Sequence, residues 1–368
     1  MLLIKVYVHL CTPLSENLSI SYNLGSLLAA LLSIQMSSGV VLSFTWPSLS
    51  FTVWMLVAVS SFDRLMLAGL CLIHSSVATM TFATMYIHIF KAWDLDLSSS
   101  LRSSVLSLGM TILMISIVTS FLGYVLPWCQ MSYWALVVIT STLSVVPWLG
   151  LKLIVTWWGS STIVVDSYQR VVMTHYESAL LMSAIVMFHL SSLHSSLSSS
   201  LISLDASDDS RCCLVAYHMM RDASIWFVVV SFILPFITMH SEVIERTDNN
   251  IFASTVATPS HIVPEWYLCF YYGMLRSVPN KALGVVLVAF TLVSLASWYV
   301  VTSVSIMSSL IMVDASANNV MLLSGSNGLW SYFITCLWIY TTMAGADHST
   351  PYLNAYLIVQ SSLLAITS

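Results

Sequence analysis

The sequence predicts an all-α integral membrane protein with eight transmembrane helices. Of its 368 residues, 58% are hydrophobic and only 7% are charged, whereas soluble domains carry about 25% charged residues. The mean hydropathy of +0.89 implies more apolar surface than a soluble protein of this length can bury. Eight charge-free stretches are each long enough for one crossing, which takes about 20 residues. The same composition excludes intrinsic disorder.

These stretches set the order of the elements, because charged residues are costly near the centre of a spanning helix. We expect helices near residues 24–44, 66–91, 102–122, 171–194, 222–241, 282–305, 326–344 and 351–367. An even number of crossings places both termini on one side of the membrane. Lys and Arg are shared almost equally between the loops of the two sides, so the positive-inside rule gives no orientation.

Two connections are too long to be simple turns. The stretch 103–151 is broken at Pro127, and the residues that follow are amphipathic enough to lie along the membrane interface. The segment 242–281 combines charges and prolines with aromatic residues that include Trp266, Tyr267, Phe270, Tyr271 and Tyr272, which favours an ordered functional loop outside the bilayer. We divide the chain into an N-terminal four-helix part, 1–205, and a C-terminal four-helix part, 206–368.

Charge and cysteine content narrow the choice of partners. The formal charge of −5 is spread without runs, so we expect no nucleic-acid partner. The 7 cysteines show no metal-binding spacing such as CxxC. Most of them lie in apolar surroundings, where a thiol behaves as a small hydrophobic group.

Histidines inside two predicted helices suggest cofactor chemistry. His74 and His88 are 14 residues apart on the second helix, and His175 and His189 are 14 apart on the fourth. This interval is nearly four helical turns, so both members of a pair share a face, about 21 Å apart along the axis. Two such helices would supply one imidazole each at two levels, which suits two six-coordinate haems. The alternative is that each histidine is an ordinary hydrogen-bonded core residue.

Glycines on the first and third helices repeat the same interval. Gly25 and Gly39 are 14 residues apart, as are Gly109 and Gly123. A glycine allows a flat ring or a neighbouring backbone to approach a helix closely. We therefore interpret these four as a haem-facing set, although small residues also serve ordinary helix packing in membranes.

Three segments add a family resemblance to these intervals. Residues 123–134 read GYVLPWCQMSYW, residues 264–267 read PEWY, and residues 275–281 read LRSVPNK. Together with the paired histidines, they resemble cytochrome b, the di-haem quinone-binding subunit of respiratory complex III. The resemblance runs from about Asn23 to Tyr352 and implies that the first four helices form a di-haem bundle. It implies that His74 and His175 bind an outer b-type haem, and that His88 and His189 bind an inner one.

The resemblance also implies two quinone sites. At the outer site Glu265 would accept a proton from quinol, as a carboxylate in a partly apolar pocket can. Tyr272 and Tyr124 would orient the quinol oxygens there. At the inner site His194 and Asp222 would supply protons to a quinone, with Ser198 as a further candidate. Without the motif, Glu265 would be taken as an exposed loop acid.

Several residues depart from the family pattern. Cys129 and Ala135 stand where the family has glycines beside the outer quinol site. Cys71 and Lys91 stand where it has arginines near the haems, which leaves the propionate partners open. Glu177 follows His175 at a position that the family keeps apolar. The segment 195–204 contains six serines in place of a Gly/Asn-rich loop.

The implied activity is that of the catalytic subunit of quinol–cytochrome c oxidoreductase, which oxidises ubiquinol in a proton-translocating Q cycle. The implied partners are a Rieske-type iron–sulfur protein, a cytochrome c1-type subunit, other complex III subunits, membrane lipids and a second copy in a homodimeric complex. The implied location is the mitochondrial inner membrane. A secondary transporter with an intramembrane His/Glu proton relay is the alternative, but it does not explain the repeated intervals.

Overall fold

A computed structural model describes residues 13–15, 18–45, 61–94, 103–196, 211–213, 217–240, 247–251, 253–260, 262–291 and 343. The chain divides into two compact units. Unit 1 comprises Met1–Leu95 and Leu193–Ser241, and unit 2 comprises Asp96–Ser192 and Glu242–Ser368. The described part is mostly helical, and 5 of its helices are long and apolar enough to cross a membrane.

These spans fall on the first five predicted windows. They are α2 (Leu24–Thr45), α4 (Ser61–Asp94), α5 (Ser103–Val125), α8 (Val165–Ser196) and the combined segment Met219–Met239. The sixth window begins as the apolar helix Lys281–Thr291. The rest of that window, and the windows 326–344 and 351–367 apart from Met343, lie outside the described residues, so the count of eight stays a prediction.

Helices α4 (Ser61–Asp94) and α8 (Val165–Ser196) extend beyond their predicted windows at both ends. Helix α4 has 34 residues and α8 has 32. The fifth span is interrupted instead. It consists of α9 (Met219–Val228), a π-helical segment (Val229–Ile233) and α10 (Leu234–Met239). Pro235 lacks an N–H and crowds the preceding turn, which accounts for the wider helix before it.

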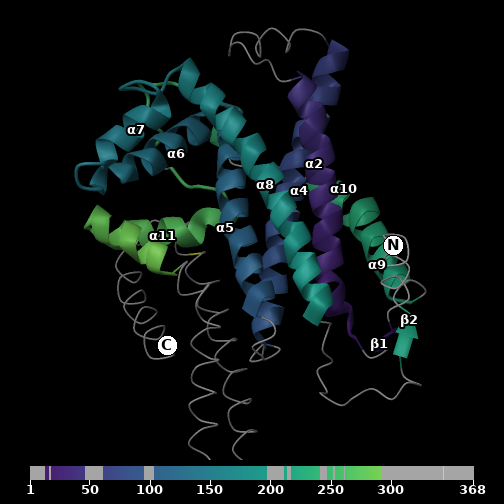
Figure 1. The fold of residues 1–368 in the computed structure, drawn as a ribbon. Coiled ribbons are helices and arrows are strands. Elements are labelled where there is room, and N and C mark those ends of the chain that lie inside the picture. Colours follow the sequence, from purple (N-terminus) through teal and green to yellow (C-terminus); the bar gives the residue numbers. More distant parts are fainter. Residues whose placement is uncertain are drawn as a thin grey trace, which may run out of the picture. The chain divides into compact units, whose positions relative to one another are not determined.

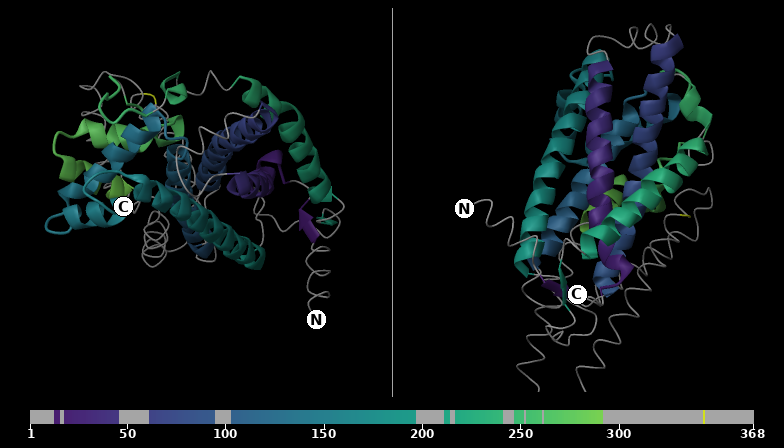
Figure 2. Two further views of the ribbon diagram at one scale, coloured as in Figure 1. Left: turned by 90° about the horizontal axis from the view of Figure 1, so that it is seen from above. Right: turned by 90° about the vertical axis from the view of Figure 1, so that its right-hand side faces the viewer.

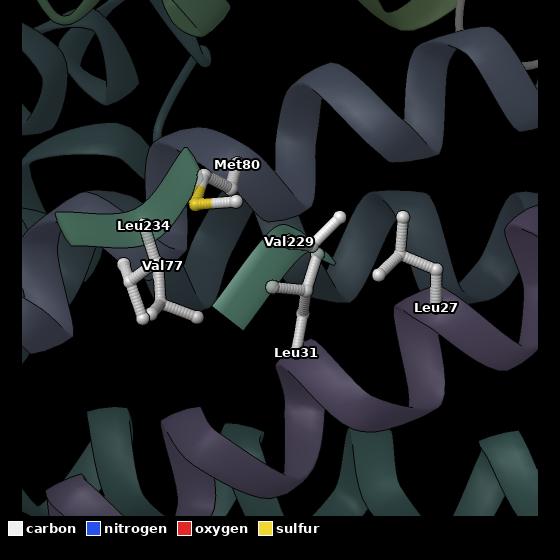
Figure 3. Close-up of a cluster of buried hydrophobic side chains, with 6 residues drawn as sticks. All are labelled: Leu27, Leu31, Val77, Met80, Val229 and Leu234. Carbon is white, nitrogen blue, oxygen red and sulfur yellow. The ribbon is translucent and has the colours of Figure 1, made fainter. Parts of the chain in front are cut away.

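The core of unit 1 lies between α2 and α4, which run side by side (Figure 1). Leu27 and Leu31 of α2 pack with Val77 and Met80 of α4, and Val229 and Leu234 complete the cluster (Figure 3). Helix α9 contacts α2 and α10 contacts α4, so the fifth span crosses this pair (Figure 2). This packing holds α2 and α4 at close range along most of their length.

Unit 1 also contains a small sheet that the sequence did not predict. Strand β1 (Pro13–Ser15) pairs antiparallel with β2 (Arg211–Cys213), and Leu14 lies opposite Cys212. The two strands come from segments about two hundred residues apart, so local propensity does not reveal their pairing.

In unit 2, α5 ends before Pro127, as predicted, and two short helices follow. They are α6 (Gln130–Ser141) and α7 (Gly150–Trp158). Trp128 has φ 54°, a left-handed conformation that reverses the chain before α6. The buried residues Leu122, Val125, Leu136 and Val171 join α5, α6 and α8 in one apolar cluster.

The predicted loop 242–281 contains short helices where the structure describes it. Two 3₁₀ segments, Thr247–Asn250 and Trp266–Leu268, precede α11 (Cys269–Ser277). Phe270, Tyr271 and Met274 of α11 are buried against Ile117 of α5 and against Leu287. This packing fixes the PEWY motif next to α5.

Candidate functional site: paired histidines and a tyrosine–carboxylate loop

In unit 1, each histidine of α4 lies opposite a glycine of α2. A β-carbon at Gly25 would lie 3.6 Å from Cε1 of His88, and one at Gly39 would lie 3.2 Å from Cε1 of His74. The helices are antiparallel, so the lower-numbered glycine meets the higher-numbered histidine. The shared interval of 14 residues therefore brings both glycines into contact with imidazole rings.

Unit 2 repeats this register between α5 and α8. A β-carbon at Gly109 would lie 3.3 Å from Cε1 of His189, and one at Gly123 would lie only 2.7 Å from Cε1 of His175. Alanine at Gly123 would therefore displace the ring. Glycine is required at this contact for its small size, because a side chain would occupy the space of the imidazole.

Hydrogen bonds fix the rings of three histidines at Nδ1. Nδ1 of His175 lies 2.8 Å from the carbonyl oxygen of Thr119, and Nδ1 of His189 lies 2.9 Å from that of Val105. A carbonyl only accepts, so both rings carry the proton on Nδ1. Nδ1 of His74 lies 2.8 Å from Oγ of Ser38.

A proton on Nδ1 suits an iron ligand, because the lone pair of Nε2 is left for the metal while the hydrogen bond at Nδ1 orients the ring. The histidines therefore fit a bis-imidazole haem by the chemistry of their donors. Within the described residues, His, Cys, Asp and Glu form no cluster of three or more that could hold a free metal ion. A porphyrin needs only two protein ligands, so the two observations are compatible.

The predicted outer-quinol residues all belong to unit 2. Glu265 is half-buried and directly precedes the 3₁₀ segment Trp266–Leu268. The Tyr272 phenol donates to the carbonyl of Ile262 at 2.8 Å. Asn249 donates through Nδ2 to the Tyr124 phenol oxygen at 3.1 Å. The sequence reasoning missed Asn249, which lies 125 residues from Tyr124.

The surroundings of this loop keep its tyrosines protonated. Burial raises the pKa of Tyr272, although Arg276, whose guanidinium lies 5.4 Å from the Tyr272 ring centroid, opposes the shift. Burial raises the pKa of Tyr267 well above its usual value, and the charge of Glu265 raises it further. These two phenols are therefore hydrogen-bond donors at neutral pH.

Gln130 was not singled out from the sequence, although it lies within the motif 123–134. Its Nε2 donates to the carbonyl of Ala257 at 3.0 Å, and its Oε1 accepts from the backbone N–H of Ser254 at 3.0 Å. Trp134 Nε1 lies 3.2 Å from both Oε1 of Gln130 and the carbonyl of Ser254. One amide side chain thus fastens the loop that precedes PEWY to the start of α6.

The predicted inner-quinone residues lie in unit 1, apart from Ser198, which is outside the described residues. His194 is exposed near the end of α8, and Asp222 is half-buried in the first turn of α9. Oδ1 of Asp222 accepts from Asn23 Nδ2 at 2.5 Å and from Ser26 Oγ at 2.6 Å. Asn23 and Ser26 are further polar neighbours that the sequence did not point to, because they lie about two hundred residues away.

The departures from the family pattern have defined positions. Ala135 is buried within α6, whereas Glu177 is exposed on α8. Nζ of Lys91 lies 3.2 Å from the ring centroid of Tyr22, a cation–π contact within unit 1. Cys129 is the N-cap residue of α6, and its backbone N–H donates to Ser132 Oγ at 2.8 Å.

Comparisons with known proteins agree with this geometry. The family described as "Cytochrome b/b6/petB" matches residues 8–197, and "Cytochrome b(C-terminal)/b6/petD" matches residues 252–364. Cytochrome b of Brachionus plicatilis is 36% identical over 278 residues, covering 74% of this chain and 72% of the relative. Cytochrome b of Marchantia polymorpha is 35% identical over 289 residues, covering 77% and 70%.

A solved structure shows the same fold. A chain of a "Hyperthermophilic respiratory Complex III" superposes with a TM-score of 0.81 at 21% identity, covering 99% of this chain and 94% of that one. The two family matches together span most of the sequence. This multi-pass membrane protein belongs to the cytochrome b family, whose members bind haem and act in electron transport.

Proposed function

We propose that this chain is the catalytic subunit of quinol–cytochrome c oxidoreductase, respiratory complex III, in the mitochondrial inner membrane. It oxidises ubiquinol and moves electrons across the membrane as part of a proton-translocating Q cycle. Its partners are a Rieske-type iron–sulfur protein, a cytochrome c1-type subunit, other complex III subunits and a second copy of the chain. Support comes from relatives named cytochrome b in eukaryotic organisms and from the fold shared with a complex III chain.

The observation that carries the proposal is the repeated glycine–histidine register. Four histidines of two helices each lie against a glycine of the antiparallel neighbour. The contact alone would also suit an ordinary core histidine, but the same interval of 14 residues in all four helices is what two cofactors at two levels require and separate core histidines do not. His74 and His175 would hold one b-type haem, and His88 and His189 would hold the other. Bound there, the two haems supply one-electron carriers at two depths in the membrane.

At the outer site, we assign proton acceptance to the Glu265 carboxylate. Quinol oxidation releases two protons and two electrons, so a base must stand beside the quinol oxygen and then reach water. Glu265 is half-buried, which lets one carboxylate face both environments. The phenols of Tyr272 and Tyr124 orient the substrate oxygens, and the Gln130 amide holds the loop in place.

At the inner site, we assign Asp222 and His194 to quinone reduction, with Ser198 as a further contact. Two hydrogen bonds hold one oxygen of Asp222, which orients the second oxygen of the same carboxylate. A quinone that takes up two electrons must also take up two protons, and a carboxylic acid with an imidazole can supply them. We also retain the division into a haem-binding part, 1–205, and a part that carries the outer-site loop, 206–368.

An optical redox spectrum of the purified protein tests the proposal. We expect a reduced α band typical of bis-histidine b haem, two haems per chain, and reduction of the haems when quinol is added. A secondary transporter would show no such band. Absence of haem from a folded, detergent-purified chain would contradict the proposed function as a whole.

A further inference from the structure

The hydrogen-bond partner at Nδ1 of His74 differs in kind from the partners at Nδ1 of His175 and His189. Ser38 Oγ lies 2.8 Å from His74 Nδ1 and 2.6 Å from the carbonyl oxygen of Ile34. The carbonyl oxygen of Gln35 lies farther away, at 3.2 Å, and carbonyls only accept, so the single hydroxyl proton of Ser38 is directed to the nearer carbonyl, that of Ile34. Oγ of Ser38 then accepts the Nδ1 proton of His74, and Nε2 keeps its lone pair.

Ser38 is placed so that water cannot readily replace it. The side chain is only 7% exposed, and it lies in the middle of α2, within a membrane-spanning segment. The next residue, Gly39, admits Cε1 of His74 to 3.2 Å from where a β-carbon would be. Ser38 and Gly39 thus determine the orientation of the ring together, one by a hydrogen bond and the other by leaving space.

The corresponding partners in unit 2 belong to the main chain. His175 and His189 donate to the carbonyl oxygens of Thr119 and Val105, which remain whatever side chain is present. The Nδ1 partner of His74 is instead a side chain. The Nδ1 partner of His74 can therefore be changed by a single substitution.

We propose that Ser38 is a positioning residue that sets the reduction potential of the haem bound by His74. This inference rests on the proposed function, because it takes His74 as an iron ligand. An acceptor at Nδ1 makes imidazole a stronger electron donor and favours the ferric over the ferrous state. Removing the acceptor leaves the Nδ1 proton without this bond in an apolar environment, so the potential should rise.

The test is a redox titration of both haems in the assembled complex, with Ser38→Ala, Ser38→Cys and Ser38→Thr variants. Loss of the hydrogen-bond partner of a ligating histidine costs about tenfold in metal affinity at the lower end of the usual range, and we expect this loss to fall on the ferric state, which the Nδ1 acceptor favours. A tenfold change in the ratio of the two oxidation states is about 59 mV for a one-electron couple. We expect Ser38→Ala to raise the reduction potential of the haem bound by His74 by about this amount, and Ser38→Cys to give a smaller rise. Ser38→Thr retains the hydroxyl and should keep the wild-type potential.

Ser37→Ala is the matched control. Ser37 is adjacent on α2 and donates to the same Ile34 carbonyl at 3.1 Å, but its side chain is exposed. It should leave both potentials unchanged. The electron paramagnetic resonance signals of the two oxidised haems identify which one responds, independently of turnover.

Three outcomes would overturn the inference. They are unchanged potentials in Ser38→Ala, an equal shift in Ser37→Ala, or a shift in Ser38→Thr as large as that in Ser38→Ala. If Ser38→Ala fails to retain haem, the Ser38→Cys variant decides, since its thiol is a weak acceptor of similar size. Two haems with unchanged potentials would contradict only the role of Ser38. A wild-type chain without haem would contradict the proposed function itself.

Discussion

The α2–α4 pair of unit 1 and the α5–α8 pair of unit 2 present histidines to glycines in the same antiparallel register, but they hold the rings differently. In unit 1 a serine hydroxyl accepts from His74, whereas in unit 2 main-chain carbonyls accept from His175 and His189. The contact of histidine with glycine is therefore common to both pairs, while the Nδ1 partner is a side chain for His74 and a main-chain carbonyl for His175 and His189.

The two pairs also differ in how their helices are joined. Between α5 and α8, Thr119 Oγ1 donates to Ser178 Oγ at 2.8 Å, Ser116 Oγ contacts the Met182 sulfur at 3.0 Å, and the hydroxyls of Ser104 and Ser192 lie 2.6 Å apart. Between α2 and α4, the buried core is the apolar cluster around Leu31 and Val77. Polar bonds between membrane helices are worth about 0.6 kcal/mol each, so the contacts of unit 2 add specificity more than stability.

The largest expected effect comes from removing a haem-binding histidine, and it tests whether each haem takes one histidine from each helix pair. His88→Leu alters unit 1 and His189→Leu alters unit 2, yet both should remove the same haem, because the loss of one imidazole leaves the iron with a single axial histidine in an apolar site. Haem content and the two α-band components are the measurements. Loss of different haems in the two variants, or retention of two haems in either, would contradict the ligand assignment.

Glu265→Gln should give the next largest effect, and it concerns unit 2 alone. The amide preserves size and hydrogen bonding but cannot accept a proton, and a general base typically contributes about 10²–10⁴-fold. We expect slower quinol oxidation by up to that factor, with both haems still bound. Asp166→Asn, at an exposed carboxylate in the first turn of α8, is the control. Equal rates for Glu265→Gln and wild type would remove Glu265 from the proton path.

A smaller effect is expected from the glycine contacts, which differ between the units. In Gly123→Ala the new methyl would lie 2.7 Å from the His175 ring, whereas in Gly25→Ala it would lie 3.6 Å from His88, an ordinary contact. The His175 ring is held by Thr119 and cannot move away freely, so overpacking should cost about 1–3 kcal/mol. Haem retention during heating should fall in Gly123→Ala and remain normal in Gly25→Ala. The reverse order would show that the register does not control ring placement.

The smallest expected effect distinguishes a side-chain hydroxyl from a main-chain carbonyl as the neighbour of a haem-binding histidine. Thr119→Val removes the hydroxyl bonded to Ser178 but keeps the carbonyl that accepts from His175. We expect a loss of about 0.6 kcal/mol in helix association, seen as a slightly lower unfolding temperature, and no change in either haem potential. A shift in haem potential as large as that expected for Ser38→Ala would contradict the distinction between a side-chain and a main-chain partner at Nδ1.

Much of this description follows from local features of the sequence. Spanning segments can be located because a bilayer requires a long apolar run wherever the chain crosses it, and the first five windows are confirmed as helices. Equal intervals of 14 residues place the members of each His or Gly pair on one helix face because helical periodicity is a local property. The PEWY loop can be identified from its motif, although the roles of Glu265, Tyr272 and Tyr124 stay predictions.

Partners that are distant in sequence required the tertiary structure. The sequence indicates that histidines and glycines share a spacing, but helix packing decided that Gly39 meets His74 and that Ser38, 36 residues from His74, accepts its Nδ1 proton. The same holds for Gln130 with Ser254, for Tyr124 with Asn249 and for the strand pair β1–β2. The physical reason is that a hydrogen bond depends on the final positions of two atoms within a few tenths of an ångström. Hydrophobic periodicity specifies only which face of a helix is buried, so the register of each helix pair comes from the packing of whole surfaces.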